Sequence, residues 1–387
     1  MNGTSTLRLA HVVGLVPAIL LGVFAGCTAR KYEPPAAFAY VTNSRDNTVS
    51  VLSLRELKVV RTLDAGRNPT GVAVNPKKDE VYVVSTDSGT VSVIDARQNA
   101  VVRTIPVQRT PYFISVSNDG RRGYVANSGS GTVSVLDLEQ YRVLTNIAVG
   151  VQPGLVRVSP DGKLAVVSNR GGNSVSVIDT ESLTVRATLP VCSRPEDVRI
   201  LADSHKAFVA CTGSNQVAVI NLKNCTVTAI LRSGGLPANL ELKADGGEIF
   251  VSNFDADTIS AINTGADEIS ETFLVGNGPA RGLVTDDSST LFVSNFRSNS
   301  VAVFDVATRK LLASVQTGTG PDALALAPDG NMLLVVDSRS GDVAVMRLDR
   351  RGDRKVTAAP PRLFTIIPTG AGASQIVIKM PEAAEVH

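Results

Sequence analysis

The sequence predicts an all-β protein, a β-propeller of four-stranded antiparallel blades, from three observations. Variants of one short string, Tyr40-Val41-Thr42-Asn43, recur every 42 residues without insertion or deletion. They begin at residues 40, 82, 124, 166, 208, 250, 292 and 334. Each repeat holds four short runs rich in β-branched residues and bounded by Gly, Pro, Asn or Asp. Tryptophan is absent, which argues against WD40-type and tetratricopeptide repeats. A four-stranded unit of this length is typical of a propeller blade.

The two ends of the repeat array predict how the ring closes. In the repeat that follows Asn68, the expected strands cover residues 69–74, 80–85, 90–95 and 100–107. The array opens with only three strands, within residues 39–63, and ends with one leftover strand at 374–379. We expect these four strands to share one blade, because closure removes exposed sheet edges. The sequence therefore predicts eight blades within residues 38–380, with seven as the alternative.

One position in the third strand of every repeat holds a small residue, and its neighbours are nearly always valine. Because side chains alternate across a strand, we expect a bulky face to pack against a small-residue face of the next blade. The small residues are Ser50, Ser92, Ser134, Ser176, Ala218, Ser260, Ala302 and Ala344.

The first 26 residues predict a signal peptide that precedes a lipidated cysteine. An apolar run at residues 12–25 is too short for a comfortable membrane span but suits a signal-peptide core. It ends in Phe24-Ala25-Gly26-Cys27, which resembles the cleavage box of bacterial lipoproteins, although that box prefers leucine at the position of Phe24. We expect Cys27 to carry the lipid and residues 27–37 to form a linker. An ordinary secretory signal or an uncleaved anchor is the alternative.

Positions that vary between repeats are the candidates for ligand-binding residues, because invariant repeat positions are expected to be structural. The middle of the innermost strand is charged in three consecutive repeats, at Arg157, Arg199 and Glu241, and small or apolar in the other five. The arginines suit a carboxylate or phosphate ligand in the central channel. A mutually satisfied Arg–Glu–Arg cluster is the alternative. Further candidates at the channel mouth are Tyr112, Phe113, Glu196, Asp197, Asn239, Arg281 and Asp322.

Three cysteines besides Cys27 lie close together in the sequence. Cys192 falls in a connection between blades, and Cys211 falls at the end of a second strand, on the same expected face of the ring. A Cys192–Cys211 disulfide is one prediction for an oxidising compartment, and three separate thiols are the other. Cys225 is left over in both.

Composition and spacing give little support for metal, cofactor or nucleic-acid chemistry. The three histidines, His11, His205 and His387, have no ligand spacing, and Asp255 with Asp257 lacks the glycine and distant glutamate of a calcium loop. The net charge of +2 does not favour nucleic-acid binding. We expect no cofactor and no nucleic-acid partner. We expect residues 349–361 to form an inserted, solvated and flexible loop between two strands, with a partner contact as the alternative, and residues 381–387 to form a C-terminal tail.

The repeat resembles the YVTN β-propeller repeat family over roughly residues 38–380. The copies GYVANS, AVVSNR, IFVSNF and LFVSNF and the companion strings TVSVID and SVSVID carry this resemblance. It implies a secreted or cell-surface protein without assigned catalysis. Many members have seven blades, so the predicted eight depart from the family.

These observations favour a non-catalytic cell-envelope lipoprotein, facing the periplasm or the cell surface. The propeller would act as a monomeric scaffold that binds an envelope protein or a small ligand, with the lipid as its membrane contact. The alternative is a lactonase-like or haem-d1-like propeller that uses the central channel for catalysis or a cofactor.

Overall fold

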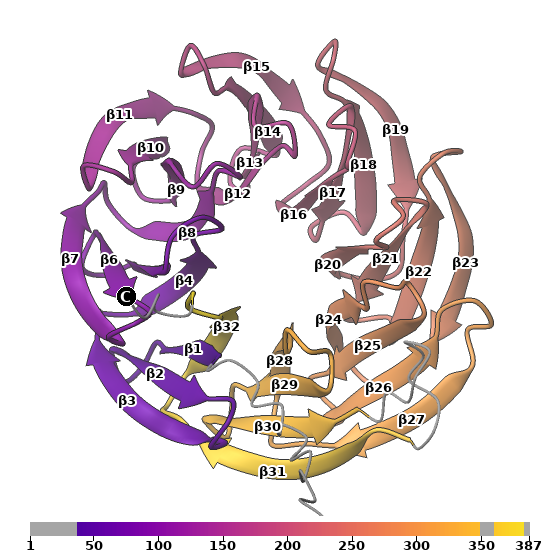
Figure 1. Ribbon diagram of the computed structural model, residues 1–387. Helices are drawn as coiled ribbons and strands as arrows, with labels where there is room; N and C mark the ends of the chain where they lie inside the picture. The colour runs from indigo at the N-terminus through magenta and orange to yellow at the C-terminus, as the bar shows by residue number, and fades with distance from the viewer. Residues whose placement is uncertain (1–36, 349–359, 383–387) are drawn as a thin grey trace, which may run out of the picture. The chain divides into compact units, whose positions relative to one another are not determined.

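The computed structural model describes residues 37–348 and 360–382, which belong to one compact unit. The expected signal peptide, Cys27, most of the inserted loop and most of the tail lie outside the described residues. The described chain forms 32 strands and no helix (Figure 1).

The innermost strands line the centre of the ring, and seven of the eight begin at a proline. Proline is tolerated at the first residue of a strand, where its missing N–H removes little from the ladder. These strands are β32 (Ala373–Lys379), β4 (Pro69–Val74), β8 (Pro111–Val116), β12 (Pro153–Val158), β16 (Pro195–Ile200), β20 (Pro237–Leu242), β24 (Pro279–Val284) and β28 (Pro321–Leu326).

The second and third strands of each blade are almost completely buried. The second strands are β1 (Phe38–Asn43), β5 (Glu80–Ser85), β9 (Arg122–Asn127), β13 (Leu164–Asn169), β17 (Lys206–Cys211), β21 (Glu248–Asn253), β25 (Thr290–Asn295) and β29 (Met332–Asp337). The third strands are β2 (Thr48–Ser53), β6 (Thr90–Asp95), β10 (Thr132–Asp137), β14 (Ser174–Asp179), β18 (Gln216–Asn221), β22 (Thr258–Asn263), β26 (Ser300–Asp305) and β30 (Asp342–Arg347).

The outer strands alternate exposed and half-buried residues because one side of each faces solvent. They are β3 (Lys58–Asp64), β7 (Ala100–Pro106), β11 (Arg142–Ala148), β15 (Thr184–Pro190), β19 (Thr226–Arg232), β23 (Glu268–Leu274), β27 (Leu311–Gln316) and β31 (Arg362–Pro368). The four strands expected from the repeat after Asn68 are confirmed, except that β7 ends one residue earlier than predicted.

Eight antiparallel sheets make the ring, and the predicted closure is confirmed. We number the blades in chain order: blade 1 is β32 with β1, β2 and β3, and blades 2 to 8 follow from β4–β7 to β28–β31. In blade 1, β1 pairs with β32, so that Tyr40 lies opposite Val377. The family's common number of seven therefore does not apply here. A strand from each end of the array completes one sheet and leaves no gap in the circle.

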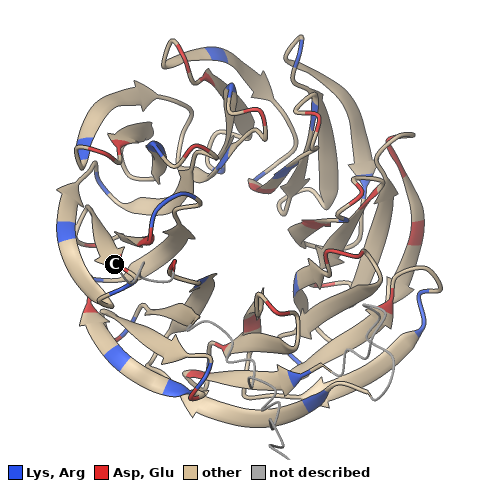
Figure 2. Cartoon of the chain, in the orientation of Figure 1, with Lys and Arg blue, Asp and Glu red and all other residues tan. Residues whose placement is uncertain are grey.

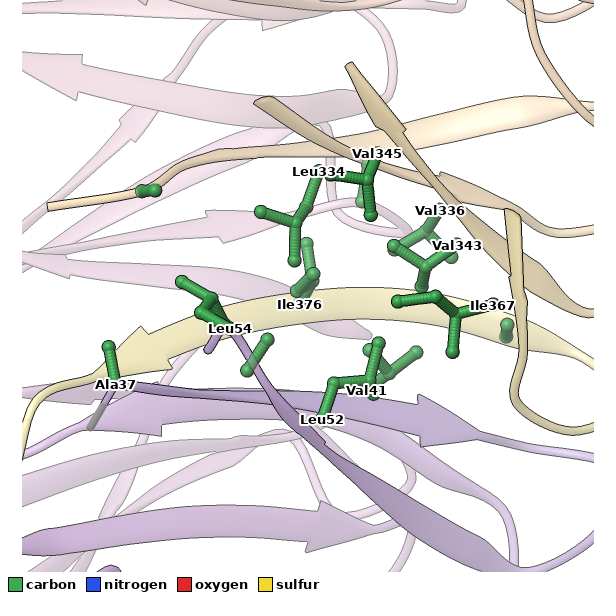
Figure 3. Close-up of a cluster of buried hydrophobic side chains, with 14 residues drawn as sticks. Ala37, Val41, Leu52, Leu54, Leu334, Val336, Val343, Val345, Ile367 and Ile376 are labelled. Carbon is green, nitrogen blue, oxygen red and sulfur yellow. The ribbon is translucent and has the colours of Figure 1, made fainter. Parts of the chain in front are cut away.

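The hydrophobic core is divided among the blade interfaces rather than gathered at the centre. Each of eight buried clusters combines residues of two adjacent blades. At the closure, Val41 and Leu52 of blade 1 pack with Val343, Val345 and others of blade 8 (Figure 3). The same kind of packing between adjacent blades therefore recurs at all eight interfaces of the ring.

The small residue of the third strand accommodates the asparagine of the repeat string. Asn127 Nδ2 donates to Ser134 Oγ at 2.8 Å, and Ser134 Oγ donates to Asn146 Oδ1 at 2.7 Å. Three other blades repeat the asparagine–serine bond, from Asn43, Asn169 and Asn253. The small side chain therefore leaves room for a buried polar contact as well as for the neighbouring blade.

The turns between second and third strands and the connections between blades share one face of the ring, which we call the mouth face. Asn47 adopts φ of 61°, and its Oδ1 accepts the amide of Asn68 in the next connection at 2.9 Å. The opposite face holds the other two kinds of turn, as the Ala96 amide bonded to the Asp79 carbonyl shows. Ala37 lies on that opposite face, since its carbonyl accepts the amide of Leu54.

A disulfide joins Cys192 and Cys211 on the mouth face, with their Cα atoms 5.7 Å apart. Of the two sequence-based alternatives, the structure therefore has the bonded one. Cys211 stands where most repeats carry the string's asparagine, and Ala218 stands where most carry serine. Cys225 is a free, half-buried thiol.

Candidate functional site

Charged residues lie along one arc of the ring's centre, in the inner strands of blades 4 to 8 (Figure 2). Arg157, Arg199 and Glu241 lie in the adjacent inner strands β12, β16 and β20, as expected from the repeat. We call these three residues with Asp197, Arg281 and Asp322 the channel arc.

Arg199 and Glu241 form the best-satisfied ion pair of the channel arc. Arg199 Nη2 lies 3.1 Å from Glu241 Oε2, and Arg199 Nε donates to the Leu240 carbonyl at 2.7 Å. Glu241 Oε1 accepts the amide of Val284 in blade 7 at 3.2 Å. Burial raises the pKa of Glu241, although Arg199 opposes that shift. These bonds connect three blades, so this pair has a structural role.

Asp197 is the most buried charge of the channel arc, with 3% of its side chain exposed. Its Oδ2 accepts Asn239 Nδ2 at 2.8 Å and the Leu240 amide at 3.0 Å. Burial opposes its ionisation, but Arg199 and Arg157 outweigh burial and lower the pKa of Asp197. Asp197 is therefore ionised and joins blade 5 to blade 6.

Arg157 is the incompletely satisfied member of the arc. Its Nη2 lies 3.7 Å from Asp197 Oδ1, and its guanidinium lies 5.2 Å from the centre of the Phe113 ring. Its Nε is buried without a hydrogen-bond partner, while 32% of the side chain stays accessible. Burial, followed by repulsion from Arg199, lowers the pKa of Arg157 to about 10. The channel thus contains a charged donor with unused capacity.

Arg281 and Asp322 form a looser pair at the mouth, where Arg281 Nε lies 3.9 Å from Asp322 Oδ1. Burial raises the pKa of Asp322, and Arg281 opposes the shift. Both side chains keep a third of their surface accessible. This pair can accept a ligand more easily than the tighter pair of Arg199.

Arg170 connects two predicted residues, Tyr112 and Glu196. Its guanidinium lies 4.2 Å from the centre of the Tyr112 ring, and its Nη1 lies 3.2 Å from Glu196 Oε1. Glu196 Oε2 is buried without a hydrogen-bond partner. Sequence reasoning missed Arg170, although an arginine directly after the repeat string, where most copies have Ser or Thr, was the available signal.

A pocket of about 420 Å³ opens beside the channel arc on the mouth face. We call it the mouth pocket and define it by Arg194, Glu196, Phe254, Arg281, Phe296 and Asp322. A second, more polar pocket of about 650 Å³ adjoins it and shares Arg194. Glu196, Arg281 and Asp322 were predicted from the sequence, whereas the other three were not. Phe254 and Phe296 also follow the repeat string directly, and that departure from Ser or Thr was their signal.

Within the described residues no group of three or more His, Cys, Asp or Glu is arranged to hold a metal ion. His205 lies in a turn on the opposite face, 3.4 Å from Asp203. Asp257 Oδ1 accepts the Gly278 amide at 2.7 Å, and Asp255 pairs with Arg297. The Asp255–Asp257 segment therefore serves turn geometry, as its sequence suggested. Across residues 37–348 and 360–382, no helix is long and apolar enough to span a membrane.

Solved structures with the same fold differ widely in sequence. The dihydro-heme d1 dehydrogenase NirN, in complex with DHE, has a TM-score of 0.72 at 17% identity and covers 90% of this chain and 76% of its own. Hydrazine synthase of Kuenenia stuttgartiensis has a TM-score of 0.59 at 22% identity, with 72% and 95% covered. A protein of unknown function from Desulfotomaculum acetoxidans DSM 771 has a TM-score of 0.61 at 16% identity, with 89% and 99% covered.

These similarities show a shared fold only, because identity is low in all three. A search of curated protein sequences finds no match. The family of YNCE-like beta-propellers matches residues 4–123 and 120–362, which is most of the chain. Together with eight copies of the repeat and eight blades, this match confirms the YVTN-type repeat inferred from the sequence. The chain belongs to the YNCE-like β-propeller family.

Proposed function

We propose that this protein is a non-catalytic lipoprotein of the bacterial cell envelope that binds an acidic group of a ligand or partner protein in the channel arc. Arg157 carries the proposal, since its Nε is buried and unpaired while 32% of the side chain remains accessible. A carboxylate or phosphate would complete its hydrogen bonds in a partly desolvated site, where charge-assisted bonds are strong.

The positions of the two faces support an anchored scaffold. Nine residues lie between Cys27 and Ala37, and the chain from one to the other spans at most about 35 Å. Ala37 lies on the face opposite the mouth face. A lipid on Cys27 would therefore tether the ring through the end of the chain that enters on the opposite face, so the tether itself would not cover the mouth face.

Binding of acetate and inorganic phosphate to the purified protein tests the channel site. Arg157→Ala should weaken binding about tenfold or more, because a hydrogen bond to a charged group contributes about 1.5–3 kcal/mol. Arg109→Ala is the matched control, an exposed arginine of the mouth face outside the arc. Unchanged affinity in Arg157→Ala, or in the double variant Arg157→Ala with Arg199→Ala, would place any ligand elsewhere.

The envelope assignment has its own test. Metabolic labelling with a palmitate analogue should mark the full-length protein and should fail in Cys27→Ala. Labelling that persists in Cys27→Ala, or a wild-type protein that remains unlabelled in the soluble fraction, would contradict a lipidated Cys27.

A channel cofactor is the second candidate, favoured by the structural similarity to NirN, whose structure holds DHE. The absorption spectrum of protein purified from its native host distinguishes the two. The scaffold proposal expects no band from a bound pigment, whereas a stoichiometric band in the visible region would replace the scaffold with a cofactor-binding function.

A further inference from the structure

The mouth pocket combines an aromatic wall of two rings with an exposed cation that has no acidic partner within the described residues. Phe254 and Phe296 come from adjacent blades, and their ring centres lie 5.9 Å apart at an interplanar angle of 55°. Both rings are half-buried and border the cavity of about 420 Å³. Leu236 and Ala280 add apolar surface to the same lining. A cavity of this kind favours a flat apolar group.

Two arginines fix the aromatic wall from outside the pocket. The Arg297 guanidinium lies 4.5 Å from the centre of the Phe254 ring, and Arg339 lies 4.5 Å from the centre of the Phe296 ring. Arg297 is held in turn by Asp255, 2.7 Å from its Nη2. The rings are therefore supported before a ligand arrives, which reduces the entropy that binding must overcome.

The pocket also contains one cation without an acidic partner. Arg281 pairs with Asp322, whereas the Arg194 guanidinium makes no hydrogen bond or ion pair within the described residues. Arg194 is exposed, and it borders both this cavity and the adjoining polar pocket. A planar guanidinium in this position is suited to a carboxylate, which it can bind through two parallel hydrogen bonds.

Glu196 adds the opposite requirement, a hydrogen-bond donor on the ligand. Its Oε1 is paired with Arg170 at 3.2 Å, but its Oε2 is buried and has no partner. A buried acceptor without a partner costs free energy until a donor reaches it. A hydroxyl or ammonium group on the ligand would supply that donor.

We propose that the mouth pocket binds small aromatic carboxylates that also carry a hydroxyl or ammonium donor. The aromatic ring packs against Phe254 and Phe296, the carboxylate binds Arg194, and the donor bonds to Glu196. This inference rests on the proposed binding function and names the ligand class that the same face selects.

Calorimetric titration with 4-hydroxyphenylacetate tests the inference, with phenylacetate, cyclohexylacetate and acetate as comparison ligands. We expect saturable binding that is tightest for 4-hydroxyphenylacetate, weaker for phenylacetate and cyclohexylacetate, and weakest for acetate. Arg194→Ala and the double variant Phe254→Leu with Phe296→Leu should each lose about tenfold in affinity. Glu196→Gln should remove most of the preference for the hydroxylated ligand over phenylacetate.

Arg109→Ala and Phe364→Ala are matched controls, an exposed arginine and an exposed phenylalanine outside the pocket, and should bind as the wild type does. Thermal melting of each variant verifies that it is folded. If the double phenylalanine variant does not fold, Arg194→Ala still tests the inference, because it removes only an exposed side chain. Equal affinity for acetate and the aromatic acids, with no effect of Arg194→Ala, would overturn this inference and leave the channel proposal intact. Failure of every carboxylate and of phosphate to bind would contradict both.

Discussion

Asp337 and Asp342 lie opposite each other on the paired strands β29 and β30 of blade 8. Asp337 is fully buried, and the Oδ1 atoms of both residues are buried without a hydrogen-bond partner within the described residues. The same positions in blade 3 hold Asn127 and Thr132, whose side chains bond to each other at 3.1 Å. Two carboxylates cannot reproduce that bond unless one of them is protonated, so blade 8 contains a proton-dependent contact.

The buried carboxyl pair of blade 8 should lower the free energy of unfolding as the pH rises from about 4 to about 7. Burial, with a further contribution from Asp342, raises the pKa of Asp337 from 3.8 to about 7. The folded state therefore binds more protons than the unfolded state between about pH 4 and pH 7, and stability decreases as pH rises through that window. At 1.36 kcal/mol per tenfold change, the loss is at most about 4 kcal/mol.

Chemical denaturation between pH 4 and 8 checks this prediction. Asp337→Asn should flatten the decrease relative to wild type and raise the free energy of unfolding at pH 8. Combining Asp337→Asn with Asp342→Thr restores the pair found in blade 3 and should retain that gain. Parallel pH profiles for wild type and Asp337→Asn would show that the carboxyl pair does not titrate in this window.

Removing the disulfide should destabilise blade 5. The bond between Cys192 and Cys211 closes a loop with a sequence separation of 19, for which about 3 kcal/mol is typical. We expect the double variant Cys192→Ala with Cys211→Ala to lose about that amount, and Cys225→Ala to lose much less. Peptide mapping under non-reducing conditions that finds Cys192 free would contradict the bond.

Enlarging the small residue of a third strand should disturb the contact between blades. Ser134 is completely buried and bonded to Asn127 and Asn146. Ser134→Phe should cost about 1–3 kcal/mol through overpacking, measured as a lower melting temperature. Ser134→Ala, which copies Ala218, controls for the lost hydroxyl. A melting temperature that is unchanged in Ser134→Phe would count against tight packing at this interface.

Loss of the closing strand should convert a monomer into aggregates. Truncation after Thr369 removes β32 and exposes the edge of β1, where Tyr40 is paired with Val377. An exposed edge strand with apolar side chains and unpaired backbone groups favours strand pairing between molecules. Light scattering after size exclusion should show a monomer for the full chain and larger species for the truncated one. A monomeric, cooperatively unfolding truncated protein would mean that closure is dispensable.

The fold was predictable because each blade carries the complete set of local signals, and eight copies average out local exceptions. Strand positions, blade number and the shared blade all followed from the period and from incomplete repeats at the ends. The pairing of Arg199 with Glu241 was also predictable from the sequence, because adjacent inner strands place equivalent repeat positions side by side.

The mouth pocket was only partly predictable, because three of its residues, Arg194, Phe254 and Phe296, lie in turns and connections outside the inner strands. Phe254 and Phe296 hold equivalent positions in adjacent repeats, but the repeat does not specify the side-chain directions that bring the two rings together. The unpaired state of Arg157 Nε depends on side-chain directions within the channel, and the repeat constrains only the backbone positions. At these positions the sequence shows only that the residue differs from those in the other repeats. Such a difference marks a candidate site residue but does not show which side chain it contacts.

We propose that arginines of the channel arc and of the mouth pocket bind a ligand. A high-resolution structure of the protein purified from its native host tests this proposal best. We expect non-protein density that reaches Arg157 in the channel or Arg194 in the mouth pocket. A channel and mouth pocket that hold only water, with a co-purified partner bound instead to the outer strands, would contradict it.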